Sequence, residues 1–221
     1  MKKFIRNNRG FIVFLLCLGV FRTAIADWNP IPSGSMRPNL LEGDVVFVNR
    51  LAYDLKIPLT DTVIAHLAEP KRGDVVTFSS PKNGMRLIKR IVGLPGDRIE
   101  VRDEVLLING QAAEYSHPET LLEPLEGGSF IDALRVTENI QGSQRRIQLF
   151  AGTFANSNFG PVVVPADSFL MLGDNRDNSA DSRYFGFVPR HLLIGQARRI
   201  LVSADILGNW LPRPERFWQA L

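Results

Sequence analysis

The sequence predicts a mostly β fold that follows one N-terminal membrane helix and carries a smaller inserted β lobe. Hydrophobic residues make up 45% of the 221 residues and charged residues 22%, a balance typical of a chain that buries a core. Beyond residue 27, short β-branched or apolar runs alternate with turn residues, and long helical patterns are hard to find. The predicted strands are Val45–Val48, Val75–Phe78, Met85–Val92, Val105–Ile108, Ile147–Phe150, Val162–Val164, Phe169–Leu172 and Ile200–Val202.

The N-terminal segment is apolar and follows basic residues at positions 2, 3, 6 and 9. Residues 10–26 would span about 26 Å as a helix, the short limit for crossing a bilayer. The basic tail, residues 1–9, keeps the N-terminus cytoplasmic. The same features, ending in Ala24-Ile25-Ala26, also fit a cleavable secretory signal. Both interpretations place residues 27–221 outside the cytoplasm.

Charge and cysteine content exclude several classes of function. Five of the 26 Lys and Arg lie in residues 1–26, which contain no acidic residue. From Asp27 onward there are 21 basic and 23 acidic residues, a net charge of −2. Such a body does not favour nucleic-acid binding. The single cysteine, Cys17, excludes an intrachain disulfide, and the three histidines lack metal-ligand spacing. We therefore expect no metal, no cofactor and no nucleic-acid partner.

Residues 102–164 are more polar and less regularly patterned than the rest of the body. Asn109-Gly110 follows the run Val105–Ile108 and predicts a two-residue hairpin turn. We interpret this stretch as an inserted second lobe. The β core then consists of residues 27–101 and 165–221.

Two segments could carry nucleophilic chemistry. In Ile31–Pro38, prolines and a glycine hold Ser33 and Ser35 in a rigid turn, although a Ser-Gly-Ser sequence is usually a plain loop. In Met85–Val92, strand alternation makes Lys89 the only charge on an apolar face. Burial disfavours an ammonium ion and lowers a lysine pKa by up to ~3–5, so a neutral amine could accept a proton from a serine. The alternative is a lysine that snorkels at a sheet edge.

A third segment, Gly173–Arg183, is a dense polar run after an apolar strand. It could hold hydroxyl donors and an ion pair around a site. A calcium loop fits poorly, because Arg176 falls where a ligand should lie. A solvated turn is the remaining alternative for the isolated segment.

Together these segments resemble the conserved boxes of bacterial type I signal peptidases, in the same order. The residues that carry the resemblance are Ser33-Gly34-Ser35-Met36-Arg37-Pro38, Ile88-Lys89-Arg90 leading into Gly93-Leu94-Pro95-Gly96-Asp97, and Gly173-Asp174-Asn175-Arg176-Asp177-Asn178-Ser179 through Arg183. The resemblance implies a membrane-anchored serine endopeptidase with a Ser–Lys dyad on a signal-peptidase-like β-barrel or β-sheet domain. Its partners would be preprotein signal peptides and the lipid bilayer.

The resemblance also implies roles for individual residues. Ser35 would be the nucleophile and Lys89 the general base. The Ser33 hydroxyl and the Ser35 backbone N–H would form the oxyanion hole. Ser179 would hydrogen-bond the lysine, and Asp181 and Arg183 would form a supporting ion pair. The residues expected to line the substrate pockets are Ile31, Pro32, Leu87 and Ile88.

Shallow pockets of this kind would favour small residues, as in Ala-X-Ala sites, and the resemblance favours an uncleaved single-pass anchor with an extracytoplasmic catalytic domain. Arg37 and Asn39 depart from the family pattern, which more often has an apolar residue and threonine. Three alternatives remain: a peptidase dedicated to one pilin or conjugation substrate, a self-cleaving repressor-type Ser–Lys peptidase, and an inactive peptide-binding β module.

Overall fold

A computed structural model describes residues 7–60, 62–124, 129–152 and 157–221. Strands dominate, which confirms the mostly β prediction, and each of the eight predicted strands overlaps an observed one. The helical elements are α2 (Arg9–Ala24), η1 (Gly34–Met36), α3 (Ser182–Phe185), η2 (Arg190–Leu192) and η3 (Pro214–Arg216). The strands are β1 (Ala26–Pro30), β2 (Asp44–Asn49), β3 (Asp54–Lys56), β4 (Val63–His66), β5 (Val75–Ser79), β6 (Arg86–Gly93), β7 (Arg98–Arg102), β8 (Val105–Ile108), β9 (Gln111–Ala112), β10 (Glu114–Pro124), β11 (Phe130–Ile140), β12 (Ser143–Phe150), β13 (Phe159–Val163), β14 (Ser168–Leu172), β15 (Val188–Pro189) and β16 (Leu193–Ser203).

A seven-stranded sheet forms the main body, in the order β1-β2-β16-β5-β6-β14-β15. Strands β5 and β6 are largely buried, and every residue of β14 is buried. Two clusters of apolar side chains pack on this sheet, one around Met36 and Val46 and the other around Phe78 and Ile91. Strand β6 lies between β5 and β14, so the residues at its centre are surrounded by core.

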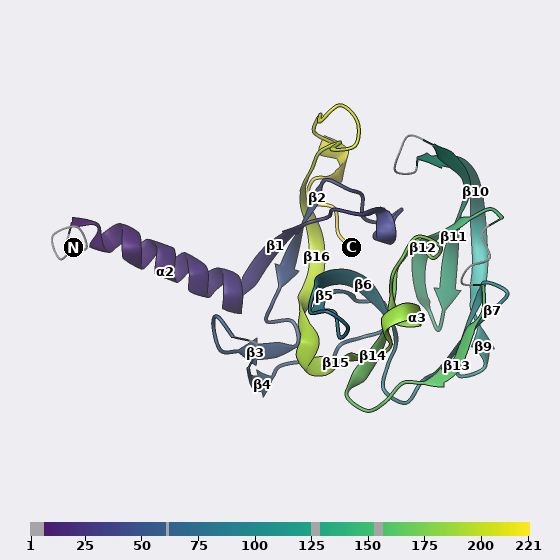
Figure 1. The fold of residues 1–221 in the computed structure, drawn as a ribbon, viewed down its shortest axis with the longest axis horizontal. Coiled ribbons are helices and arrows are strands. Elements are labelled where there is room, and N and C mark those ends of the chain that lie inside the picture. Colours follow the sequence, from purple (N-terminus) through teal and green to yellow (C-terminus); the bar gives the residue numbers. More distant parts are fainter. Residues whose placement is uncertain (1–6, 61, 125–128, 153–156) are drawn as a thin grey trace.

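Two smaller sheets, β13-β7-β8-β9 and β10-β11-β12, form the second lobe on the side of the body away from α2 (Figure 1). Strand β7, which contains residues 98–101 of the predicted core segment, pairs with β8 and β13 in one of these smaller sheets. The predicted turn at Asn109-Gly110 joins β8 to β9. Both residues have positive φ, 54° and 83°, as a type I′ hairpin turn requires.

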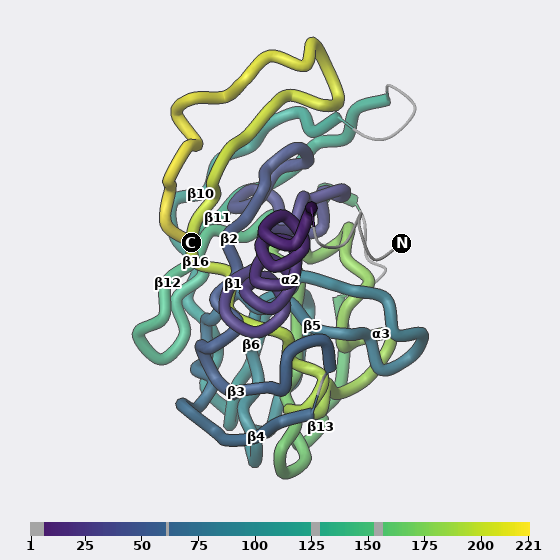
Figure 2. Tube along the Cα trace, turned by 90° about the vertical axis from the view of Figure 1, so that its left-hand side faces the viewer, coloured from purple at the N-terminus to yellow at the C-terminus, as the bar shows by residue number. Residues whose placement is uncertain are grey.

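Helix α2 projects from the body and runs directly into β1 (Figures 1 and 2). The predicted helical segment 10–26 was too long at its C-terminal end, because the helix ends at Ala24 and Ala26 already pairs with Asn49 on β2. The buried Asp27 carboxylate accepts hydrogen bonds from Arg22 at 2.8 Å and from Arg86 at 2.9 Å, which fixes the end of the helix to β6. Among the described residues, no helix has the length and apolarity to cross a bilayer.

Candidate active site

Ser35 lies in η1, a short 3-10 helix that is tightly packed against the main sheet. Met36 is fully buried in the apolar cluster beneath it, so it anchors the turn. Gly34 is closely packed, since a Cβ there would lie 2.9 Å from Glu42 Oε1 and would displace that carboxylate. Ser35 itself is 8% exposed. Residues 33–39, called the nucleophile loop after the role predicted for Ser35, therefore present Ser35 from a fixed position.

Lys89 lies at the centre of β6 and is 3% exposed. Its Nζ donates a hydrogen bond to Ser35 Oγ at 2.6 Å. Burial lowers the Lys89 pKa from 10.5 to about 8, although the carboxylates of Asp181 and Asp174 act in the opposite direction. The amine is therefore about half neutral near pH 8 and lies in contact with a hydroxyl.

Arg90, the next residue on β6, is also buried but has a carboxylate partner. It donates to both carboxylate oxygens of Asp174, at 2.8 and 2.6 Å. Asn39 Nδ2 donates to the same carboxylate at 2.7 Å. Asp174 is thus bound by groups on β6 and on the nucleophile loop, and it joins the two.

Asn175 binds the backbone on both sides of Ser35. Its Nδ2 donates to the Gly34 carbonyl at 3.0 Å, and its backbone N–H donates to the Ser35 carbonyl at 3.2 Å. The sequence analysis did not single out this residue. Its position in the polar run Gly173–Arg183 indicated a place near the site, but the run alone does not show which side-chain amide contacts the nucleophile loop.

Asp181 and Arg183 form a buried ion pair with two hydrogen bonds of 2.8 Å. Asp181 also accepts the backbone N–H of Gly173 at 3.0 Å. The pair therefore fixes the start of the polar run that carries Asp174 and Asn175.

Ser179 does not make the hydrogen bond to Lys89 that the family resemblance implied. Its Oγ is buried and has no hydrogen-bond partner among the described residues. The side chain packs on Gly173, where an added Cβ would lie 2.2 Å from Ser179 Oγ and 2.5 Å from the Ser35 carbonyl oxygen. Ser179 thus lies near Ser35, but among the described residues it makes no hydrogen bond to the amine.

Ser33 immediately precedes η1, is exposed and has an extended backbone. The Ser35 N–H lies in the first turn of η1, where backbone N–H groups have no acceptor within the helix. Both groups belong to the nucleophile loop.

The four predicted pocket residues do not share one wall. Ile31 and Ile88 belong to the cluster around Met36, whereas Leu87 packs in the cluster around Phe78 on the other side of β6. Pro32 is exposed beside Ile31. The four expected lining positions therefore lie on both faces of β6, because strand alternation places adjacent residues on opposite faces.

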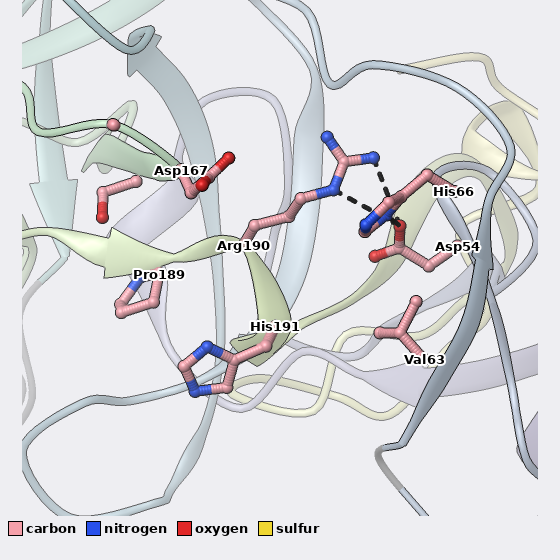
Figure 3. Close-up of a pocket in the computed structure, with 9 residues that line it drawn as sticks. Asp54, Val63, His66, Asp167, Pro189, Arg190 and His191 are labelled. Carbon is pink, nitrogen blue, oxygen red and sulfur yellow. Dashed lines mark hydrogen bonds and ion pairs between the residues drawn. The ribbon is translucent and has the colours of Figure 1, made fainter.

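A separate cavity of about 340 Å³ lies by the β3–β4 hairpin and contains neither Ser35 nor Lys89. Figure 3 shows Arg190 reaching across it to Asp54, which also binds His66 Nδ1 at 2.7 Å. These contacts tie the hairpin to η2. Among the described residues, no group of three or more His, Cys, Asp or Glu could hold a metal ion.

A buried hydroxyl in contact with an amine that titrates near neutrality is equipped for nucleophilic catalysis, because the amine can remove the hydroxyl proton. Comparison with known proteins agrees with this chemistry. Residues 4–202 match the family model described as "Signal peptidase, peptidase S26".

Curated relatives give the same result. A signal peptidase I of Buchnera aphidicola subsp. Schizaphis graminum is 35% identical, over 91% of this chain and 74% of the relative. That of Pseudomonas fluorescens is 34% identical, over 90% and 72%. A crystal structure of signal peptidase I from Enterococcus faecalis aligns with 59% of this chain and 97% of its own at 30% identity, with a TM-score of 0.35.

The chain belongs to the signal peptidase family, peptidase S26. It is a serine endopeptidase that removes signal peptides.

Proposed function

We propose that Ser35 is the nucleophile and Lys89 the general base of this peptidase. The observation that carries the proposal is the 2.6 Å hydrogen bond between Lys89 Nζ and Ser35 Oγ in a buried environment. The neutral amine takes the hydroxyl proton while Oγ attacks the scissile carbonyl. The ammonium then gives that proton to the leaving amine, and the neutral amine activates a water that releases the acyl group.

The Ser35 N–H and the Ser33 hydroxyl stabilise the oxyanion in this mechanism. The exposure of Ser33 and its position beside η1 support the assignment, because its hydroxyl is available to a substrate. Loss of one such donor typically lowers the rate by ~10²–10³. Asp181 and Arg183 act indirectly, by fixing the backbone around Asp174.

The substrate binds as an added strand beside the first half of β6. Residues 86–89 of β6 pair with β5 on one side. On the other side, β14 pairs with β6 only from Arg90 onward, so among the described strands none covers that edge of β6 next to Lys89. An extended peptide can hydrogen-bond to such an edge. Ile31, Pro32 and Ile88, together with Leu87 on the face of β6 that also carries Lys89, then provide the shallow apolar surfaces that favour small residues, as in Ala-X-Ala sites.

Helix α2 serves as a retained membrane anchor, with a cytoplasmic N-terminus and an extracytoplasmic catalytic core. Ala24 and Ala26 are buried, and Ala26 is paired in β1. Cleavage after Ala26 would require β1 to leave the sheet. N-terminal sequencing of the enzyme from active cells tests this: we expect no product that begins at Asp27.

The catalytic proposal is tested by cleavage of a preprotein with an Ala-X-Ala site. Ser35→Ala and Lys89→Ala should each lower the rate by roughly 10³-fold or more. The exposed residues Lys82 and Ser116 provide matched controls, and Lys82→Ala and Ser116→Ala should cleave at the wild-type rate. Wild-type activity in either dyad variant would refute the proposal.

A further inference from the structure

The nucleophile loop contacts the second lobe through two side chains that follow Ser35 closely. Arg37 forms an ion pair with Glu123 on β10, 86 residues later in the chain, and its Nε donates to Glu42 at 2.8 Å. Asn39 Nδ2 donates to the carbonyl of Arg146 on β12 at 2.7 Å. The loop is therefore attached to the sheet β10-β11-β12 at two points.

These contacts are buried, so they constrain the loop more than a surface pair would. The Glu123 side chain is 3% exposed and that of Arg37 is 12% exposed. Arg135 on β11 binds the second carboxylate oxygen of Glu123 at 2.9 Å. Glu123 is thus held by its own sheet and cannot follow the loop if the loop moves.

The same sheet also reaches the other side of the nucleophile loop. Arg135 Nε donates to Gln148 Oε1 at 2.9 Å on β12, and Gln148 forms a parallel bridge with Asn175. The backbone N–H of Gln148 donates to the Asp174 carbonyl, and the Gln148 carbonyl accepts from the backbone N–H of Arg176, both at 2.9 Å.

Asn175, which this bridge positions, binds the carbonyl groups of Gly34 and Ser35. The polar contacts therefore form a closed path, from the nucleophile loop through Glu123 and Gln148 to Asn175 and back to the loop. One end of the path lies two residues after the nucleophile, and the other end binds the nucleophile's own carbonyl.

We propose that the sheet β10-β11-β12 is a positioning element of the active site, in which Glu123 holds Arg37 so that Ser35 stays against Lys89. The inference rests on the proposed Ser–Lys function. It assigns the second lobe a role in catalysis, with Glu123 and Arg37 as positioning residues that do not touch the substrate.

The test compares Glu123→Gln with Glu119→Gln, a matched control. Both residues lie on β10 and pair with an arginine. The Glu119–Arg146 side-chain pair is exposed, however, and the nucleophile loop binds the backbone carbonyl of Arg146, which Glu119→Gln leaves in place. Glu123→Gln should lower kcat about ten- to a hundredfold, because small misplacements of a reacting group have effects of this size. KM should change little, since the proposed substrate edge on β6 is intact.

A pH profile separates positioning from loss of stability. When the loop loosens, water reaches Lys89, whose charge otherwise lies among the core and the carboxylates of Asp174 and Asp181. The acid limb of kcat/KM should therefore move to higher pH in Glu123→Gln, and activity should recover partly in alkaline buffer. Simple unfolding of part of the sample would lower the amplitude without moving the limb.

The outcomes are distinct. If Glu123→Gln and Glu119→Gln have equal kcat and the same acid limb in the pH profile of kcat/KM, and Ser35→Ala is inactive, the positioning role is overturned and the proposed function stays intact. An active Ser35→Ala would instead refute the proposed function. If Glu123→Gln does not fold, Arg37→Gln removes the other end of the contact and gives the same reading, with thermal melting as the check on folding.

Discussion

Replacement of Lys89 by methionine should stabilise the protein while it abolishes activity. Burial lowers the Lys89 pKa from 10.5 to about 8, a fall of about 2.5. At about 1.4 kcal/mol per pKa unit, protonated Lys89 destabilises the folded state by about 3 kcal/mol. Methionine fills a similar volume without charge, but the hydrogen bond to Ser35, worth about 1 kcal/mol, is lost. The net gain at pH 7 is therefore about 2 kcal/mol.

The pH dependence of this gain has a defined sign. Below about pH 8 both the folded and the unfolded wild type are protonated at Lys89, so the destabilisation is fully present. Between about pH 8 and 10.5 the unfolded state binds more protons than the folded state, so wild-type stability rises with pH. The advantage of Lys89→Met should shrink across that window.

Urea denaturation of the wild type and Lys89→Met between pH 6.5 and 10 measures the difference. Ser35→Ala is the matched control, because it removes the same hydrogen bond but keeps the amine. It should be less stable than the wild type by about 1 kcal/mol, with little dependence on pH. A Lys89→Met variant that is less stable than the wild type at pH 7, or a pH-independent gain, would refute the reasoning.

Three further predictions follow from the charges around the site. The kcat/KM of the wild type should rise about tenfold per pH unit below pH 8 and level off above it; a flat profile from pH 6 to 8 would contradict a Lys89 base. Asp181→Asn should move that limb to lower pH, because the Asp181 carboxylate raises the Lys89 pKa; a shift to higher pH would count against this. Glu138→Gln should lower the free energy of unfolding at pH 7 by about 3–5 kcal/mol, because two buried arginines lose their partner. Since the Glu138 pKa is lowered from 4.5 to about 2, the difference should fade as pH drops through that range in urea denaturation.

Local patterns predicted much of the main sheet and the burial of Lys89. Strand periodicity placed Lys89 in the interior of an apolar strand, and β6 with its buried lysine is found there. Turn chemistry predicted the β8–β9 hairpin at Asn109-Gly110. Both succeed because the signal lies within a few adjacent residues, where backbone geometry and alternation act directly.

The second lobe was harder to predict because its strands carry charged residues inward. In β10, an exposed pattern with two prolines hides the buried Glu123, which is satisfied by arginines from the nucleophile loop and from β11. Glu138 on β11 is buried in the same way against Arg145 and Arg176. The sequence pattern predicts that such charged residues are exposed to solvent, because the arginine partner that permits their burial lies far away in the chain.

The nucleophile loop shows the same limit. Arg37 and Asn39 were recognised only as departures from the family pattern, yet both contact the lobe. Their partners, Glu123 and the Arg146 carbonyl, have no sequence feature that points back to residue 37 or 39. For Ser179 the resemblance indicated a position near the site, but the expected hydrogen bond to Lys89 is not found, and the hydroxyl packs against Gly173.

Two adjacent residues of β6 show how the fold separates a reactive cation from a structural one. Lys89 and Arg90 are both buried, but Asp174 binds Arg90 through both carboxylate oxygens and raises its pKa. Lys89 instead contacts a neutral hydroxyl, so desolvation dominates and its pKa falls. If Asp174 were bound to Lys89, the amine would stay protonated and could not act as a base. In the proposed mechanism, the Arg90–Asp174 pair therefore serves catalysis by occupying the carboxylate that would otherwise hold the proton on Lys89.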